Sequence, residues 1–306
     1  MELSYFVEQA ANGVGYGLML FLMAAGLTLV FGVMDTLNLA HGSLFMAGGY
    51  GAALAQSYTG SFITALVFGV LLAGVAGVLL EAVLVKHLYR RDHLTQVLAT
   101  FGVVLIAEDL VKVIFGSAPL LMQTPPWLAA PINLMAGFGY PSYRAFVLAC
   151  GLLAVVGLFS LLKYSRLGMQ LRAGAFDRPM AELMGVRVRS IFTATFALGA
   201  ALAGLAGALL GPLTAVQPGM GESILIPALV VIVIGGVGSI SGALVGSLLV
   251  GLVDTAGRAF LPMFASMVLP PGPATDVGNG VANILMYLLM AMVLAFRPMG
   301  LFPART

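Results

Sequence analysis

Residues 223–253 read SILIPALVVIVIGGVGSISGALVGSLLVGLV, without one Asp, Glu, Lys or Arg. A helix needs roughly 20 mostly apolar residues to cross a membrane, because the hydrocarbon layer is about 30 Å thick and each residue rises about 1.5 Å. This stretch is long enough for a broken pair of such helices. Six further stretches also lack these charged residues: 9–34, 36–80, 113–143, 145–162, 190–221 and 277–296. The sequence therefore predicts an integral membrane protein with many spans.

The composition supports the same fold class. Hydrophobic residues make up 60% of the 306 residues and charged residues only 8%, against about a quarter charged in soluble domains. A closed barrel is excluded because the apolar runs are continuous, whereas barrel strands alternate apolar and polar residues. We expect one all-α transmembrane domain over residues 1–306, polytopic, with about eight spans (roughly seven to nine) and broken or re-entrant segments. The expected spans are 11–33, 37–57, 62–85, 94–115, 144–162, 191–211, a broken pair within 224–253, and 279–296.

The positions of Lys and Arg predict the orientation, because these residues concentrate on the cytoplasmic side. The Pro-rich connections 116–143 and 262–278 contain neither residue, so we expect them outside, together with the N-terminus. The C-terminus and two other cation-rich regions are expected in the cytoplasm. Their cations are Lys86, Arg90 and Arg91 in the first region, Lys163, Arg166, Arg172, Arg178, Arg187 and Arg189 in the second, and Arg297 and Arg305 at the C-terminus.

We expect no nucleic-acid partner, no metal and no cofactor for this chain. The formal charge of +2 is small and spread along the chain, so nothing suggests nucleic acid as a partner. The single Cys150 permits no internal disulfide. Neither a metal-ligand spacing nor a G-x-x-x-x-G-K-[ST] phosphate loop occurs, so we expect no metal and no cofactor in this chain. The first 34 residues contain Glu2 and Glu8 but no Lys or Arg, so we expect the first span to be retained rather than cleaved as a signal peptide.

Asn38 and His41 are the first candidates for a translocation pathway or gate, together with Gly42. Polar groups at membrane depth usually face a pore, a partner or another helix, because facing lipid is unfavourable. The i,i+3 spacing predicts that Asn38 and His41 share one helical face. They either line a pathway or start a discontinuous helix, or they only hydrogen-bond neighbouring helices, at roughly 0.6–2 kcal/mol per bond. Both interpretations stay open.

Three glycines and one serine within 234–242 form the second group of candidates: Gly235, Gly236, Gly238 and Ser239. Glycine clusters break helices, and transporters build solute sites at broken helices whose freed backbone groups meet a water-filled cavity. Glycines also let helices approach closely, which is an equally good explanation here.

Two groups of charged residues beside the predicted outer loops favour a structural interpretation. Glu108 and Asp109 precede Lys112 by four and three residues, so we expect ion pairs between them. Asp254 and Arg258 repeat the pattern at i,i+4. Snorkelling toward the membrane surface explains both groups better than a proton relay.

The cytoplasmic segment 165–186 predicts a short capped helix at its centre. Asp177 suits the N-cap, Pro179 the first turn and Gly185 the stop. These residues alone favour an ordinary loop helix on the membrane surface, with its arginines near anionic lipid head groups, over a docking helix.

Three blocks in this order carry a resemblance to a known family: GLTLVFGVM at 26–34 with NLAHG at 38–42, SRLG at 165–168 with LMGV at 183–186, and GGVGS at 235–239 with Gly242. The sequence resembles the LivH-type permeases of branched-chain (hydrophobic) amino-acid ABC importers over most of its length. This resemblance implies a channel-forming permease subunit of an ATP-driven importer in the bacterial inner membrane.

The resemblance also implies partners and roles. The second block is similar to a cytoplasmic coupling loop, within 163–190, that docks into an ATP-binding subunit. Its candidate coupling residues are Arg172, Asp177, Arg178, Ala181, Glu182 and Gly185. The implied complex has a second permease subunit (a related chain or another copy), two subunits that bind ATP and Mg, and a periplasmic solute-binding protein. The solute stays open among branched-chain or other amino acids, urea, amides and aromatic acids.

Two alternatives belong to other classes. An ion-coupled secondary transporter or channel would share midplane polar residues and broken helices, but it needs a coupling-ion site, and we find no unpaired carboxylate near a predicted span centre. An intramembrane enzyme needs a nucleophile and a base in reach of each other. His41 and Ser43 are at i,i+2 and do not share a helical face. We therefore expect a transport subunit without catalytic residues.

Overall fold

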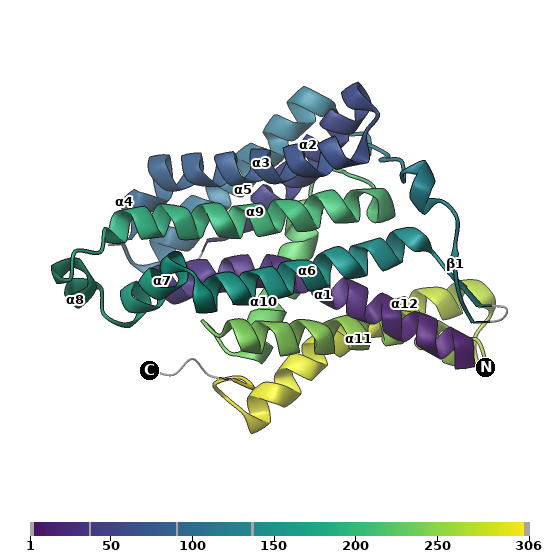
Figure 1. Ribbon diagram of the computed structural model, residues 1–306. Coiled ribbons are helices and arrows are strands. Elements are labelled where there is room, and N and C mark those ends of the chain that lie inside the picture. The colour runs from purple at the N-terminus through teal and green to yellow at the C-terminus, as the bar shows by residue number, and fades with distance from the viewer. Residues whose placement is uncertain (1–2, 37, 90, 136–137, 303–306) are drawn as a thin grey trace. The chain divides into compact units, whose positions relative to one another are not determined.

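The computed structural model describes residues 3–36, 38–89, 91–135 and 138–302, and most of them are helical (Figure 1). Arg90 and Arg305, used above for orientation, lie outside the described residues, as does Leu37 at the start of a predicted span. The elements are α1 (Leu3–Met34), α2 (His41–Thr59), α3 (Phe62–Leu80), the π-helical η1 (Glu81–Val85), α4 (Lys86–Leu88), α5 (His93–Phe115), the 3₁₀ turn η2 (Pro126–Leu128), β1 (Ile132–Met135), β2 (Phe138–Tyr140), α6 (Ser142–Tyr164), α7 (Arg166–Phe176), α8 (Arg178–Leu183), α9 (Val188–Thr214), α10 (Met220–Gly235), α11 (Ile240–Ala265) and α12 (Pro271–Phe296).

The all-α membrane fold class is confirmed. Within the described residues, six helices are long and apolar enough to cross a membrane: Ser4–Met34, Phe62–Leu88, Ser142–Tyr164, Val188–Thr214, Ile240–Ala265 and Gly272–Phe296. The apolar α10 is shorter, and α2 and α5 occupy the other two predicted spans. The predicted broken pair is α10 and α11, which are separated by residues 236–239.

Two elements differ from the sequence-based expectation. The connection 116–143, which we expected outside the membrane, contains a short antiparallel hairpin, β1 paired with β2, where we expected only a loop. Helix α12 begins at Pro271 instead of residue 279, because proline is well tolerated in the first turn of a helix, where its missing N–H has no intrahelical partner.

The chain divides into two compact units, each assembled from segments far apart in the sequence. Among the described residues, unit 1 contains 3–21, 126–152 and 227–302. Unit 2 contains 22–125 and 153–226.

In unit 2, helices α2, α3 and α9 pack against one another through small residues (Figure 1). One face of α3 carries Phe62, Ala65, Gly69, Ala73 and Gly77, and all five are buried. A Cβ atom added at Gly69 would lie 2.5 Å from the backbone oxygen of Gly48 in α2. Close helix approach through small residues is typical of packing in membranes.

The remaining surface of α3 is apolar and exposed, with Ile63, Val67, Leu71, Val75 and Leu79 each more than half exposed. Large apolar side chains outside and small residues inside suit a lipid environment, because lipid does not drive large apolar groups into the core.

In unit 1, α11 packs against α12 and against the first part of α1 by the same means. A Cβ at Gly17 would lie 2.8 Å from the oxygen of Ser247, and one at Gly13 would lie 3.1 Å from the Cα of Leu252. Bulkier residues at these positions would separate the helices.

Candidate functional site

The break between α1 and α2 spans residues 35–40 and is held by polar groups within unit 2. Asp35 has a positive φ of 53°, which is uncommon for a residue with a side chain. The Oδ1 atom of Asn38 accepts a hydrogen bond from the backbone N of Ala40 at 3.1 Å. The N–H of Leu39 donates to Oγ1 of Thr100 in α5 at 3.2 Å. The described residues of the break are therefore held by specific hydrogen bonds.

His41 is the first residue of α2 and is completely buried. Neither ring nitrogen has a hydrogen-bond partner among the described residues. A Cβ added at Gly26 in α1 would lie 2.6 Å from the imidazole Nε2 and 2.7 Å from the backbone oxygen of Gly199 in α9. The ring is thus packed tightly between two helices without a polar contact to satisfy it.

Asn38 precedes α2, so the prediction that Asn38 and His41 share one helical face is wrong. Asn38 lies three residues before the start of α2, and His41 is its first residue. The Nδ2 atom of Asn38 is buried without a partner among the described residues, so neither side chain bonds a neighbouring helix. Unpaired buried polar groups are unfavourable, by about 1–3 kcal/mol each.

Gly42 lies where α2 crosses the start of α10. A Cβ at Gly42 would lie 2.6 Å from the backbone oxygen of Gly221, so the two backbones touch directly. A side chain at this crossing would move α10 away from the break.

The glycine-rich candidates lie between α10 and α11 in unit 1. Gly236 and Gly238 have positive φ values of 102° and 81°, a conformation that side chains disfavour. The Oγ atom of Ser239 accepts the N–H of Gly242 at 3.1 Å and caps α11. A Cβ at Gly235 would overlap the backbone of Gly242.

The backbone groups freed at the end of α10 meet protein. The N–H groups of Leu301 and Phe302 donate to the oxygens of Ile234 and Gly235, each at 2.9 Å. A packing role therefore accounts for the residue types at Gly235, Gly236, Gly238 and Ser239.

The predicted docking segment forms two capped helices, α7 and α8. Ser165 caps α7, because its Oγ accepts the N–H of Gly168 at 3.0 Å. Asp177 caps α8, because its Oδ1 accepts the N–H of Met180 at 3.0 Å. Gly185 ends this turn with φ of 85°. The predicted N-cap and stop are confirmed.

Exposed apolar side chains gather at α8 and its two flanks. Phe176 at the end of α7 is 87% exposed, Leu183 in α8 is 84% exposed, and Met184 directly after α8 is 77% exposed. Ala181 is buried, whereas Glu182 and Arg172 are exposed. Arg172 is held in place by a hydrogen bond from Nη1 to the oxygen of Leu162.

One side chain connects α8 to the α1–α2 break. Nη2 of Arg178 donates to the backbone oxygen of Val33 at 3.0 Å, in the last turn of α1. The guanidinium also lies 5.2 Å from the ring centre of Phe192 in α9, a cation–π distance. Arg178 therefore links α8 to the residues directly before the break.

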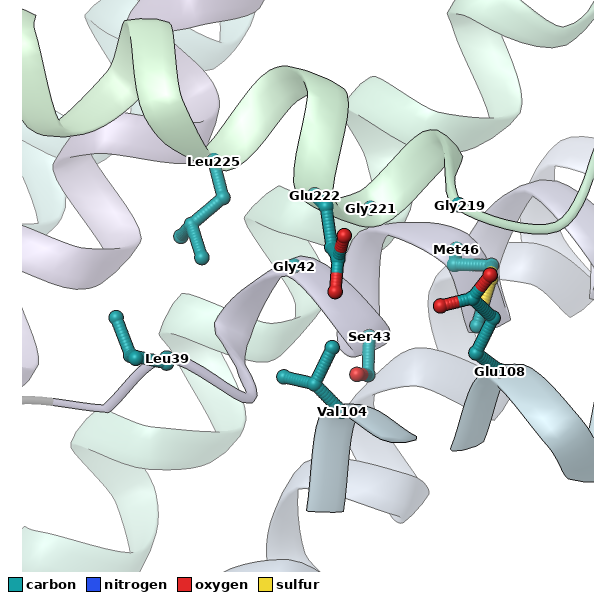
Figure 2. A pocket seen from close by; sticks show the side chains of 10 residues that line it. All are labelled: Leu39, Gly42, Ser43, Met46, Val104, Glu108, Gly219, Gly221, Glu222 and Leu225. Atoms are coloured by element: carbon teal, nitrogen blue, oxygen red, sulfur yellow. The ribbon is translucent and has the colours of Figure 1, made fainter. Parts of the chain in front are cut away.

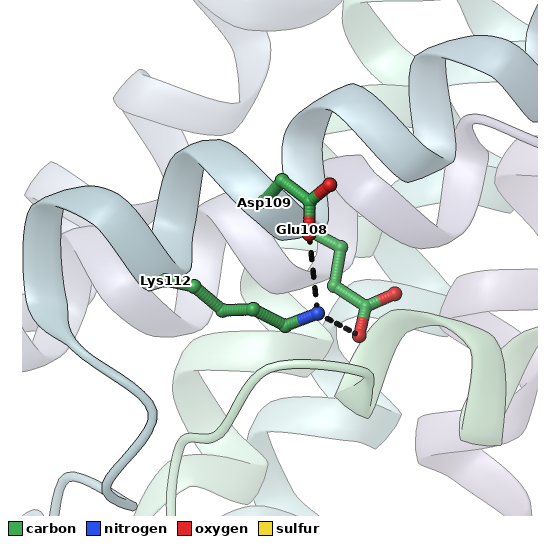
Figure 3. Close-up of polar contacts among 3 residues, drawn as sticks. All are labelled: Glu108, Asp109 and Lys112. Carbon is green, nitrogen blue, oxygen red and sulfur yellow. Dashed lines mark hydrogen bonds and ion pairs between the residues drawn. The ribbon is translucent and has the colours of Figure 1, made fainter.

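The expected ion pairs are present. Figure 3 shows Nζ of Lys112 between the carboxylates of Glu108 and Asp109, at 3.2 Å from each. Nε of Arg258 lies 2.9 Å from Oδ2 of Asp254.

A small pocket in unit 2 contains two residues that the sequence reasoning passed over, Glu222 and, as a ligand group, Ser43. The pocket lies between α2, α5 and the first turn of α10, and Glu108 also lines it (Figure 2). Glu222 is the only Asp, Glu, Lys or Arg between Arg189 and Asp254. That isolation in an apolar stretch is the signal by which sequence analysis could have found it.

Known proteins are similar to this chain over most of its length. A family model described as the permease component of the branched-chain amino acid transport system matches residues 9–294. The high-affinity branched-chain amino acid transport system permease protein BraD of Pseudomonas aeruginosa is 28% identical over 312 residues, which cover 98% of this chain and 96% of BraD. The corresponding protein LivH of Escherichia coli K12 is 30% identical over 270 residues, 84% of this chain and 87% of LivH.

Among solved structures, a metal-chelate-type ABC transporter in an inward-facing conformation has a TM-score of 0.48 at 16% identity, over 94% of this chain and 85% of the other. A similarity of this size carries no conclusion about the present chain.

Proposed function

The chain belongs to the family of branched-chain amino acid transport permease components, and from this premise we propose that it carries a small polar solute, such as a branched-chain or other amino acid, into the cytoplasm. It is the membrane-spanning subunit of an ATP-binding-cassette importer. It is a transport component and a multi-pass membrane protein.

The observation that carries this proposal is the contact of Arg178 with the oxygen of Val33. An importer must convert a movement in its ATP-binding subunits into a movement of the spans. Exposed apolar side chains at α8 and its two flanks are suited to docking, and Arg178 joins α8 to the end of α1. Beyond that end lie Asn38 and His41, which are buried with unpaired polar atoms. We assign Asn38, His41 and Gly42 to the gate that this movement displaces.

The proposed complex contains a second permease subunit, two ATP-binding subunits and a periplasmic solute-binding protein. ATP and Mg would bind to the partner subunits, because the sequence has no phosphate-binding loop of the P-loop type. The surface that docks an ATP-binding subunit would be formed or supported by Arg172, Asp177, Arg178, Ala181, Glu182 and Gly185. In the proposed orientation this surface and the C-terminus are cytoplasmic and the N-terminus is external.

The test is to replace Arg178 in the complete complex, reconstituted in vesicles with the solute-binding protein. We expect Arg178→Ala to lower solute uptake per ATP hydrolysed, because α8 is then no longer tied to α1. The matched control is Arg187→Ala, which removes the same charge from the same loop; its side chain has no hydrogen bond or ion pair among the described residues. Co-purification reports whether the ATP-binding subunits stay attached.

Equal coupling in Arg178→Ala and Arg187→Ala would refute the role of this contact. Solute flux without any ATP-binding subunit would refute the proposed function and favour a channel. Rapid ATP hydrolysis by the purified chain alone would refute the assignment of ATP hydrolysis to separate subunits.

A further inference from the structure

A second cavity in unit 2 lies between α4, α8 and the first turn of α9, and it is much larger than the pocket beside the α1–α2 break. Figure 1 shows α4 and α8 on either side of the start of α9. The volume of this cavity is about 650 Å³, within the range of about 300–1,000 Å³ that is typical of ligand sites. We call it the basic cavity, because Lys86, Arg178 and Arg189 line it.

The basic cavity lies at the ends of two membrane-spanning helices. The span Phe62–Leu88 ends in α4, and the span Val188–Thr214 is α9. Each has 27 residues, so each is about 40 Å long at about 1.5 Å per residue. A bilayer with its head groups is about 40–45 Å thick. Lys86 and Arg189, in the last and the first turn of these spans, therefore reach the level of the lipid head groups.

The lining of the basic cavity is positively charged. Its three cationic side chains oppose Glu182, the one carboxylate among the described lining residues. None of the three cations forms an ion pair with any described residue. Helix α9 also begins without a side-chain cap, so the positive end of its dipole adds to the attraction for an anion. The cavity therefore suits an anionic group with several oxygen acceptors, such as a phosphate.

Specific contacts hold the aromatic wall of the basic cavity in place. The hydroxyl of Tyr89 donates to Oε1 of Glu81 at 2.7 Å, and Oγ1 of Thr193 in α9 donates to Oε2 of Glu81 at 3.0 Å. The rings of Tyr89 and Phe192 meet edge-on, with 5.2 Å between their centres. When the buried Glu81 is counted with the lining, three cations still face two carboxylates. The cavity is therefore formed and cationic before a ligand binds.

An exposed apolar surface leads from the basic cavity toward the interior of the membrane. Val83 is 71% exposed, and its backbone oxygen lies 2.9 Å from Nδ1 of His87, which lines the cavity. Leu79 in α3 is 58% exposed. Both apolar residues belong to the span Phe62–Leu88, so their exposed side chains contact lipid chains. The anion that fits this arrangement therefore carries hydrocarbon chains.

An acidic part of an ATP-binding subunit is the competing occupant. Arg178 and Glu182 line the cavity and also belong to the proposed docking surface. The exposed apolar side chains of that surface, Phe176, Leu183 and Met184, do not line the cavity. The docking surface and the cavity are therefore neighbouring features, and an experiment can separate them.

We propose that the basic cavity binds the head group of an anionic phospholipid, whose acyl chains lie along the exposed surface of α3 and η1. Lys86 and Arg189 bind the phosphate oxygens, since neither is paired with a described carboxylate. Arg178 uses one N–H donor for Val33, and a guanidinium has five. Basic pockets between spanning helices on the cytoplasmic side suit such head groups. Neither the solute nor the energy source of transport enters this inference.

The test measures binding of palmitoyl-oleoyl phosphatidylglycerol to the delipidated complete complex in a neutral detergent, by native mass spectrometry. Phosphatidylcholine with the same acyl chains is the neutral probe, and we expect it to bind more weakly. We expect Lys86→Ala/Arg189→Ala to lower the affinity for phosphatidylglycerol about 25-fold, at about fivefold for each charge. The matched control is Lys163→Ala/Arg187→Ala, which removes one lysine and one arginine that do not line the cavity. Its affinity should stay within about twofold of wild type.

Glu182→Gln keeps the experiment decisive if the double variants assemble poorly. It removes the one described carboxylate of the lining, so the affinity for phosphatidylglycerol should rise about fivefold. A gain of affinity cannot result from misfolding. An unchanged or lower affinity in Glu182→Gln would overturn the lipid site.

Three other results would also overturn it. Equal losses in the two double variants would show a diffuse attraction of lipid to surface charge. Displacement of phosphatidylglycerol by an equal concentration of inorganic phosphate would show a site for a soluble anion. Normal lipid binding in Lys86→Ala/Arg189→Ala, together with loss of the ATP-binding subunits on co-purification, would place an acidic surface of those subunits in the cavity. Solute uptake and ATP hydrolysis test the proposed function separately from all of these results.

Discussion

Removal of the Asp177 cap is expected to lower the stability of α8. In Asp177→Ala, the N–H of Met180 loses its acceptor at 3.0 Å, and α8 has only six residues over which to recover the loss. Loss of an N-cap costs about 0.5–2 kcal/mol. This range corresponds to an approximately 2- to 30-fold fall in the ratio of folded to unfolded α8, at about 1.4 kcal/mol for each tenfold.

The assay is solute uptake and solute-stimulated ATP hydrolysis by the reconstituted complex. Because α8 has to dock as a formed helix, we expect both activities to fall together in Asp177→Ala, while the solute-binding protein still binds its solute. Asp177→Asn is the matched control, since asparagine is as good an N-cap as aspartate but carries no charge. Normal coupled transport in Asp177→Ala would show that the docking surface is elsewhere. An equal defect in Asp177→Asn would show that the charge, and not the cap, is the functional property.

Three further results are expected. His41→Ala should impair uptake more than assembly, because the buried ring has no hydrogen bond to lose; failure of the complex to assemble would show that packing was its main role. Gly69→Ala should destabilise the chain by about 1–3 kcal/mol in a detergent melting assay, because its Cβ would lie 2.5 Å from a carbonyl oxygen of α2, whereas Gly74→Ala, which has open space around it, should not. Equal melting of the two would refute the close packing. Arg172→Cys in a Cys150→Ala background should resist an impermeant thiol reagent in intact cells; ready labelling would invert the proposed orientation.

The helices were predictable because lipid imposes a strong and local constraint. Every spanning segment must satisfy its own backbone hydrogen bonds, so a long apolar run without charges predicts a helix. The same local logic predicted the caps at Asp177 and Gly185, since each is a preference of one residue for one backbone position.

The site was less predictable because its contacts join distant segments. The contact joins Arg178 and Val33, which are 145 positions apart in the sequence. No local sequence pattern predicts a contact over this separation. Asn38 was placed on the wrong side of a helix boundary, because an i,i+3 spacing has meaning only where the backbone is already helical. Glu222 was passed over because a single charge has no periodicity, although its isolation in an apolar stretch was visible.

The packing of α1 on α11 joins two helices that are synthesised at different times. Gly17 and Ser247, which touch across these helices, are separated by 247 − 17 = 230 positions. At a synthesis rate of about 5–20 residues per second, α1 is made roughly 10–50 s before its partner surface exists. The glycine face of α1 has to be covered during that interval by lipid or by the insertion machinery. In a chain that stops before α11, this face never gains its helix partner and stays in contact with lipid or the insertion machinery.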